Sequence, residues 1–135
     1  LFGKCGSLLG RLLAMRLIRG SQAREFWFHE GCFITEWSNS GDDPGLSVAR
    51  VRLPAGTTTR WHRLAGITER YVILAGQGRA GIGRETVEVG PGDVIVIAPG
   101  ERQRITAVGP DDLEFLALCT PRFCPDAYIE LDDHR

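Results

Sequence analysis

Residues 56–76 read GTTTRWHRLAGITERYVILAG, and they decide the fold. The stretch holds two runs rich in threonine, aromatic and β-branched residues, joined by a short turn at Gly66. Stiff and aromatic side chains suit a pleated surface, so both runs are predicted to be strands. The first run carries His62 and the second carries Glu69. A histidine and a carboxylate directed into one cavity are typical of a metal site or of a general base.

Leu64 follows two residues after His62 and therefore shares its face of the strand, because strand side chains alternate with a period of two. This apolar side chain stands where a second ligand would be most useful. The same alternation is expected to place Arg60 on the face of His62, and Tyr71 on the face of Glu69.

The rest of the chain has the sequence pattern of an all-β protein, since short runs of strand-forming residues alternate with clusters of the turn-forming residues glycine, proline, aspartate and asparagine. Many short strands without a convincing internal helix predict a sandwich or barrel of the jelly-roll type. A short helical turn is expected in the tail, around 126–131. The predicted strands are 26–28, 32–37, 46–53, 57–64, 67–75, 78–82, 85–89, 94–97, 103–108 and 113–120.

Length and composition indicate one ordinary globular domain, because 135 residues suffice for a single core. We assign this barrel domain to residues 26–135 and treat residues 1–25 as an N-terminal extension with room for a short helical segment. The apolar stretch near the start is broken by two arginines, which makes it too short and too charged for a membrane span. Met15 is the only methionine, and we hypothesise that native translation starts there and that residues 1–14 are not native.

Net charge and cysteine content limit the expected binding partners and the expected cellular compartment. The net charge is -1, with 16 basic and 17 acidic residues interspersed, so neither nucleic acid nor a membrane surface is an expected partner. The four cysteines form no CxxC pair and fit no zinc-ligand spacing. Buried free thiols in a reducing cytoplasm are favoured over a disulfide framework.

The spacing within residues 56–76 resembles the first motif of the cupin superfamily, G-x5-H-x-H-x3or4-E-x6-G. Gly56, His62, Glu69 and Gly76 stand at the glycine, first histidine, glutamate and final glycine positions, and Leu64 stands at the second histidine position.

The chain keeps the spacing of the second cupin motif, G-x5-P-x-G-x2-H-x3-N, but several of the motif residues are replaced. Gly92 and Gly100 match its two glycines. The proline, histidine and asparagine positions hold Ala98, Gln103 and Ala107.

The resemblance implies a small antiparallel double-stranded β-helix barrel, whose interior holds a divalent metal bound by three histidines and one glutamate. In this chain the implied ligands are His62, Glu69 and Gln103, and the metal would be manganese, iron, nickel or zinc. The alternative is a metal-free pocket in which His62 and Glu69 form an acid–base couple, since a carboxylate neighbour raises the pKa of an imidazole. A purely structural polar network is a third possibility.

Further ligand-binding candidates surround this pair. Arg60 is a candidate to hold a substrate carboxylate, or else is a solvated arginine at the end of a strand. Tyr71 offers a phenol or packs in the core, and Gln103 offers a hydrogen bond to the substrate. Cys119 either approaches the site or serves as a small buried hydrophobe.

Two functions follow from these residues. The first is a cytoplasmic small-molecule-binding cupin that acts as an enzyme of isomerase, lyase or dioxygenase type, with His62 and Glu69 as catalytic residues. The alternative is a non-catalytic binding or sensor module without a metal. Small cupins commonly form homodimers, and 26–28 and 123–131 are the expected interface segments.

Overall fold

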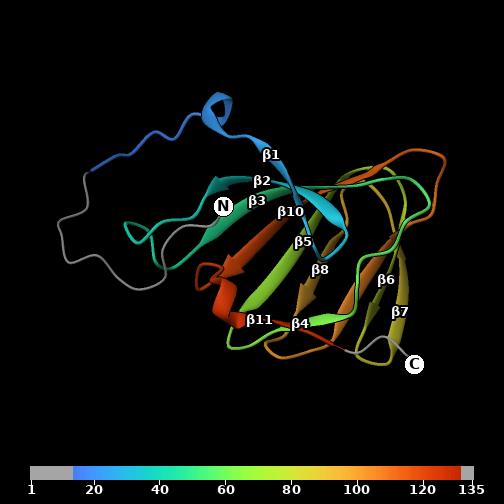
Figure 1. The fold of residues 1–135 in the computed structure, drawn as a ribbon. Coiled ribbons are helices and arrows are strands. Elements are labelled where there is room, and N and C mark those ends of the chain that lie inside the picture. Colours follow the sequence, from blue (N-terminus) through green and yellow to red (C-terminus); the bar gives the residue numbers. More distant parts are fainter. Residues whose placement is uncertain (1–13, 132–135) are drawn as a thin grey trace.

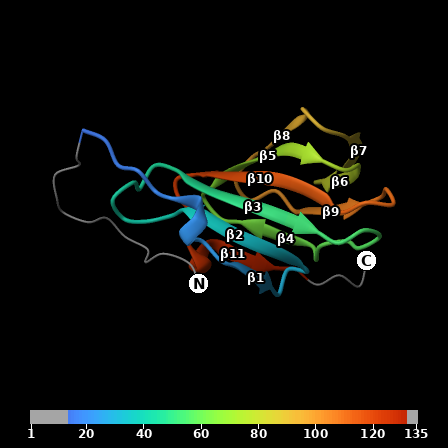
Figure 2. The same ribbon diagram turned by 90° about the horizontal axis from the view of Figure 1, so that it is seen from above.

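The computed structural model describes residues 14–131, which form two antiparallel sheets that face each other (Figures 1 and 2). The six-stranded sheet has the order β1-β2-β3-β10-β5-β8, and the five-stranded sheet has the order β11-β4-β9-β6-β7. This arrangement confirms the predicted jelly roll. The strands are β1 (Glu25–Phe28), β2 (Cys32–Ser38), β3 (Ser47–Leu53), β4 (His62–Leu64), β5 (Thr68–Ala75), β6 (Gly78–Ile82), β7 (Glu85–Val89), β8 (Val94–Ile97), β9 (Gln103–Ala107), β10 (Leu113–Thr120) and β11 (Tyr128–Glu130).

The core lies between the sheets and is organised around β10, which pairs with β3 on one side and β5 on the other. Every second residue of β10 from Leu113 onward is buried, the alternation expected of a strand with one face toward the core. Phe115 lies opposite Val51 and Ile73 in the two ladders, and its ring contacts that of Tyr71 at a centroid distance of 4.4 Å. The inward face of β10 therefore forms one wall of the barrel interior.

The glycines of the two motifs occupy turns that other residues would strain. Gly76 has a φ of 84°, and a Cβ at this position would lie 2.3 Å from the carbonyl oxygen of Asp112. Only glycine tolerates both this conformation and this close approach. The preserved glycine spacing therefore marks real turns between strands.

The strand predicted over 57–64 is the main error in the predicted secondary structure. Only His62–Leu64 forms a strand, β4, and Thr58 makes an isolated bridge to Thr106. The backbone N–H of Arg60 donates to the carbonyl of Glu30 at 2.8 Å, so the chain leaves the ladder to meet the turn between β1 and β2. The alternation expected from Arg60 to His62 fails for this reason.

The two ends of the described chain differ in part from the predictions. In the N-terminal extension the described residues include one short 3-10 helix, Gly20–Gln22, and residues 1–13 lie outside the described part. The tail forms the expected helical turn as a 3-10 helix at Pro125–Ala127, and then adds β11, which was not predicted. Within residues 14–131 no helix combines the length and apolarity needed to cross a membrane.

The described cysteines differ in their bonding state. Cys32 and Cys119 are buried free thiols, as predicted. Cys124 is disulfide-bonded, contrary to the prediction.

Candidate functional site

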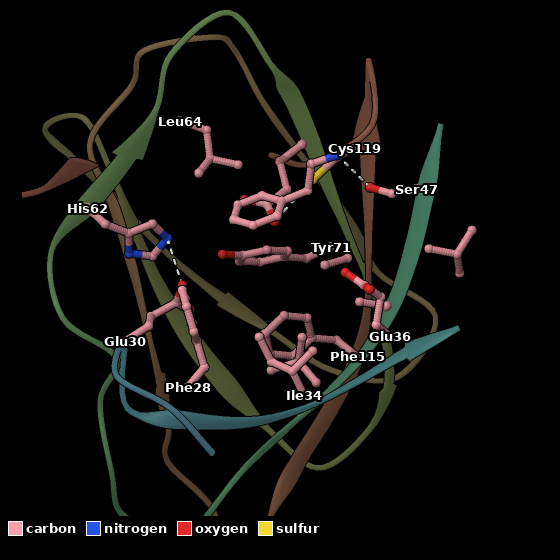
Figure 3. A pocket seen from close by; sticks show the side chains of 16 residues that line it. Phe28, Glu30, Ile34, Glu36, Ser47, His62, Leu64, Tyr71, Phe115 and Cys119 are labelled. Carbon is pink, nitrogen blue, oxygen red and sulfur yellow. Dashed lines mark hydrogen bonds and ion pairs between the residues drawn. The ribbon is translucent and has the colours of Figure 1, made fainter. Parts of the chain in front are cut away.

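A cavity of about 50 Å³ opens between the sheets. It is lined by residues of β1, β2, β3, β4, β5 and β10, of the turn after β1 and of the segment after β10 (Figure 3). Most of its wall is apolar and includes the rings of Phe28, Phe115 and Phe123. A single water needs about 10–15 Å³ of such volume, so the cavity holds a few waters or a small organic molecule. The side chains with polar atoms along the wall are Glu30, Glu36, Ser47, His62, Glu69, Tyr71 and Cys119.

His62 lies at the start of β4 with its side chain 1% exposed. Its Nδ1 is 2.7 Å from the carbonyl oxygen of Arg60, and because a carbonyl only accepts, Nδ1 carries the proton and donates it. Its Nε2 faces Oε1 of Glu30 at 3.4 Å (Figure 3). Burial lowers the pKa of His62, so the neutral ring is favoured and Nε2 is an acceptor. The ring of Tyr128 stacks on the imidazole and restricts its orientation.

Glu30 is a site residue that the sequence did not identify. It lies in the turn between β1 and β2, which Gly31 closes with a φ of 112° and an N–H donated to the carbonyl of Phe28. Burial raises the pKa of Glu30 to about 7, and the thiol of Cys32, 3.7 Å from Oε2, opposes this shift. Below about pH 7 the neutral carboxyl of Glu30 is favoured, and its Oε1 then faces the unprotonated Nε2 of His62. An acidic residue beside a turn glycine has the pattern of an ordinary surface turn, so the sequence carried no signal for it.

Glu69 projects from β5 into the same cavity and is 8% exposed. Its Oε2 is 3.7 Å from the thiol of Cys119, whereas its Oε1 has no hydrogen-bond partner among the described residues. Burial, followed by the charge of Glu30, raises the pKa of Glu69 to about 7, although the charge of His62 and hydrogen bonding from the side chains of Gln103 and Cys119 oppose the shift. A buried polar atom without a partner calls for an explanation, and here the unpaired oxygen belongs to a side chain that lines an open cavity.

Gln103 and Tyr71 bond to each other. The Tyr71 hydroxyl donates to Oε1 of Gln103 at 2.6 Å, and both side chains are buried. Gln103 pairs with His62 between β9 and β4, yet it is not one of the residues that line the cavity. Tyr71 does line it, with its hydroxyl end on the side of His62 (Figure 3). Gln103 therefore supports Tyr71, and its carbonyl oxygen is already engaged.

The other predicted site residues separate into two groups. Cys119 lines the cavity, and burial raises the pKa of its thiol, so it is present as a neutral thiol. Leu64 also lines the cavity, and packs in a small apolar cluster with Ile67 and Cys119. Arg60 does not line it: its side chain is 56% exposed and pairs with Glu130 at 3.1 Å.

The metal implied by the cupin resemblance can be tested against these donors. Of the family's four ligand positions, Leu64 offers no donor atom, and the oxygen of Gln103 accepts from Tyr71. His62 and Glu69 remain, and Nε2 of His62 faces Glu30. Among residues 14–131 no group of three or more histidine, cysteine, aspartate or glutamate side chains is placed to hold a metal ion. Because a catalytic metal normally has three protein ligands, the residues present do not fit the family's metal.

Comparison with known proteins agrees with the fold and the motifs. The family model described as "Cupin domain" matches residues 49–119, and the chain belongs to this family. The oxalate-binding protein of Thermotoga maritima is 39% identical over 70 residues, which cover 52% of this chain and 58% of that protein. The matched part is therefore less than two thirds of this relative's length.

Solved structures show the same fold. Pac13, a nucleoside dehydratase from Streptomyces, aligns with a TM-score of 0.74 and 20% identity, covering 87% of this chain and 92% of Pac13. A predicted oxalate decarboxylase from Thermotoga maritima aligns with a TM-score of 0.65 and 26% identity, covering 78% of this chain and 99% of the other. KdgF from a Halomonas species aligns with a TM-score of 0.69 and 19% identity, covering 82% and 96%. Pac13 and KdgF, at this low identity, are similar in fold alone.

Proposed function

We propose that this cupin carries out acid–base chemistry of isomerase or lyase type on a small organic molecule bound in the cavity. The observation that carries the proposal is the placement of three proton-exchanging groups around one cavity. Nε2 of His62 and Oε1 of Glu30 face each other at 3.4 Å, and Glu69 presents an unpaired buried oxygen.

The carboxyl groups suit this role because burial brings their pKa values to about 7. A group that titrates near the working pH populates both its acid and its base form, which favours proton transfer in either direction. We assign the base to Glu69, whose Oε1 is unpaired, and the acid to the Glu30–His62 pair, in which the protonated carboxyl of Glu30 faces Nε2 of His62.

The step would run as follows on a carbonyl compound. Oε1 of Glu69 takes a proton from the carbon beside the carbonyl as the C–H bond breaks. The Glu30–His62 pair gives its proton to the carbonyl oxygen, so that a neutral enol forms and the cavity carries no net added charge. In a hydroxy ketone, Glu69 returns its proton to the former carbonyl carbon while the neighbouring hydroxyl gives its proton to the Glu30–His62 pair, which yields the isomer. In a substrate with a β-hydroxyl, that group leaves as water with the proton from Glu69, and the enol returns its proton to the pair, which yields the elimination product.

The size of the cavity and the names of the similar proteins support a small substrate. A volume of about 50 Å³ suits a molecule with few non-hydrogen atoms. A predicted oxalate decarboxylase and an oxalate-binding protein act on or bind a small molecule by their names.

The test is proton exchange between small hydroxy ketones and deuterated water, followed by proton NMR. We expect the chain to exchange the C–H proton of hydroxyacetone or dihydroxyacetone faster than buffer does. Glu69→Gln keeps the size of the side chain but removes the base, and we expect a rate loss of about 100-fold or more.

Glu88→Gln is the matched control, because Glu88 is a 63% exposed glutamate on β7 that pairs with Arg79 outside the cavity. It should exchange at the rate of the unaltered chain. Exchange that Glu69→Gln leaves undiminished, or the same buffer rate for all variants, contradicts the proposal.

A second candidate is a non-catalytic binding module. Two observations favour it: the wall is mostly apolar, and the relative from Thermotoga maritima is named for binding. The binding module predicts that ligands shift the resonances of the cavity while proton exchange stays at the rate of buffer.

A further inference from the structure

The charged side chains along the cavity are of one sign. Among residues 14–131, Glu30, Glu36 and Glu69 line it, and no lysine or arginine does. The remaining basic group is His62, in which burial favours the neutral ring. Glu69 is 8% exposed and lines the cavity, and its Oε1 has no hydrogen-bond partner among the described residues.

The arginines on the surrounding segments are bonded elsewhere. Arg60 pairs with Glu130 at 3.1 Å. Arg70 donates to the carbonyl of Thr68 and to the hydroxyl of Thr120. Neither of the two contributes positive charge to the cavity wall.

Arg122 is buried, yet its charge also stays behind the wall. Its Nη1 donates to Oδ1 of Asn39 at 2.6 Å, and Nδ2 of Asn39 donates to Glu36 at 3.0 Å. The neutral amide of Asn39 therefore stands between Arg122 and the acidic wall. An anion beside Glu30 and Glu69 would meet two carboxyl groups, and no lysine or arginine among the described residues lines the cavity to offset their charge.

We infer that the cavity selects small organic molecules without negative charge, which offer hydroxyl, carbonyl or amine groups to Glu30 and Glu69, and that it excludes anions such as dicarboxylates. The inference rests on the proposed use of this cavity and names the substrate class for it. It also separates this chain from the relative that is named for binding oxalate.

The test uses two probes of similar shape and different charge, oxalate and the uncharged oxamide. The full chain labelled with nitrogen-15 is titrated with each probe at about pH 8, where the carboxyl groups are ionised. Shifts of the amide signals of cavity residues report binding. The variants are Glu69→Gln and Glu30→Gln, and Glu88→Gln is the control, since Glu88 lies outside the cavity. The spectrum itself shows whether each variant is folded.

We expect oxamide to shift the cavity signals of the unaltered chain and oxalate to bind about tenfold more weakly or worse, because a like charge a few ångströms away is costly in a buried site. Each cavity variant should strengthen oxalate binding by about tenfold or more and change oxamide binding by less than about threefold. The control variant should behave as the unaltered chain.

Three results would overturn the inference. Oxalate could bind the unaltered chain as tightly as oxamide, the cavity variants could leave oxalate binding unchanged, or neither probe could shift cavity signals in any variant. The readout is equilibrium binding, so charge selection that holds while proton exchange fails would refute only the proposed catalysis. Proton exchange on a neutral ketone together with tight oxalate binding would refute only the charge selection.

Discussion

Glu69→Gln is expected to make the folded protein more stable by about 3 kcal/mol above about pH 7, and to give no gain near pH 4. Burial raises the pKa of Glu69 from 4.5 to about 7. The folded state therefore binds this proton more tightly than the unfolded state does. The stability from the neutral carboxyl is fully present below about pH 4.5, falls as the pH rises, and is lost above about pH 7.

Two neighbours shape the measured curve. Glu30, with a pKa raised in the same way to about 7, adds a decline over the same window. His62, whose pKa is lowered from 6.5 by burial, acts in the opposite direction, because its contribution is present above 6.5 and is lost as the pH falls. Between about pH 4.5 and pH 7 the two carboxyl groups therefore lower the stability as the pH rises, and His62 offsets part of this decline below about pH 6.5.

Urea unfolding followed by far-UV circular dichroism, at about pH 5 and about pH 8, measures the effect. Glu88→Gln should change stability by less than about 0.5 kcal/mol at both values, because an exposed ion pair is worth little. If Glu69→Gln keeps the slope of the unaltered chain, Glu69 is not the buried acid described above.

The second large effect is an expected increase in the affinity for a divalent metal. Leu64→His combined with Gln103→His is expected to bind a divalent metal at least about a thousandfold more tightly than the unaltered chain, which corresponds to about 4 kcal/mol. The double variant places histidines at both missing positions of the motif. Leu64 and His62 already line the cavity with Glu69, and Gln103 pairs with His62 across β4 and β9.

Titration calorimetry with zinc or manganese measures the affinity, and thermal unfolding with and without metal checks it independently. Leu64 is 3% exposed, so its replacement costs stability that bound metal should restore. Gln103→His alone is the matched control, because Leu64 still withholds one ligand, and it should gain far less. An unaltered chain that binds metal as tightly as the double variant would contradict the conclusion drawn from the donor set.

The fold could be predicted from sequence because its determinants are local or evenly spaced. The motif glycines lie in tight turns with positive φ angles. Gly76 is also required by its close approach to the backbone of Asp112. Alternating burial in β5 and β10 follows from the two-residue period of a strand. His62, Glu69, Tyr71 and Cys119 all line the cavity.

The rest of the site depends on contacts between distant segments. Glu30 meets His62 because the turn between β1 and β2 closes over the chain before β4, and the N–H of Arg60 bonds to the carbonyl of Glu30. That bond also turns Arg60 outward. β11 pairs with β4 and brings Tyr128 onto the ring of His62. None of these pairings has a local pattern, so residue types alone did not reveal them.

The central claim is that Glu30 and Glu69 are buried acids that titrate near neutrality beside a neutral His62. Carbon-13 NMR of the glutamate carboxyl carbons, assigned with Glu30→Gln and Glu69→Gln, tests it most directly. We predict that the two signals titrate with midpoints near pH 7 and that His62 stays neutral with the proton on Nδ1. Midpoints near the ordinary value of 4.5 for both carboxyl groups would contradict the account.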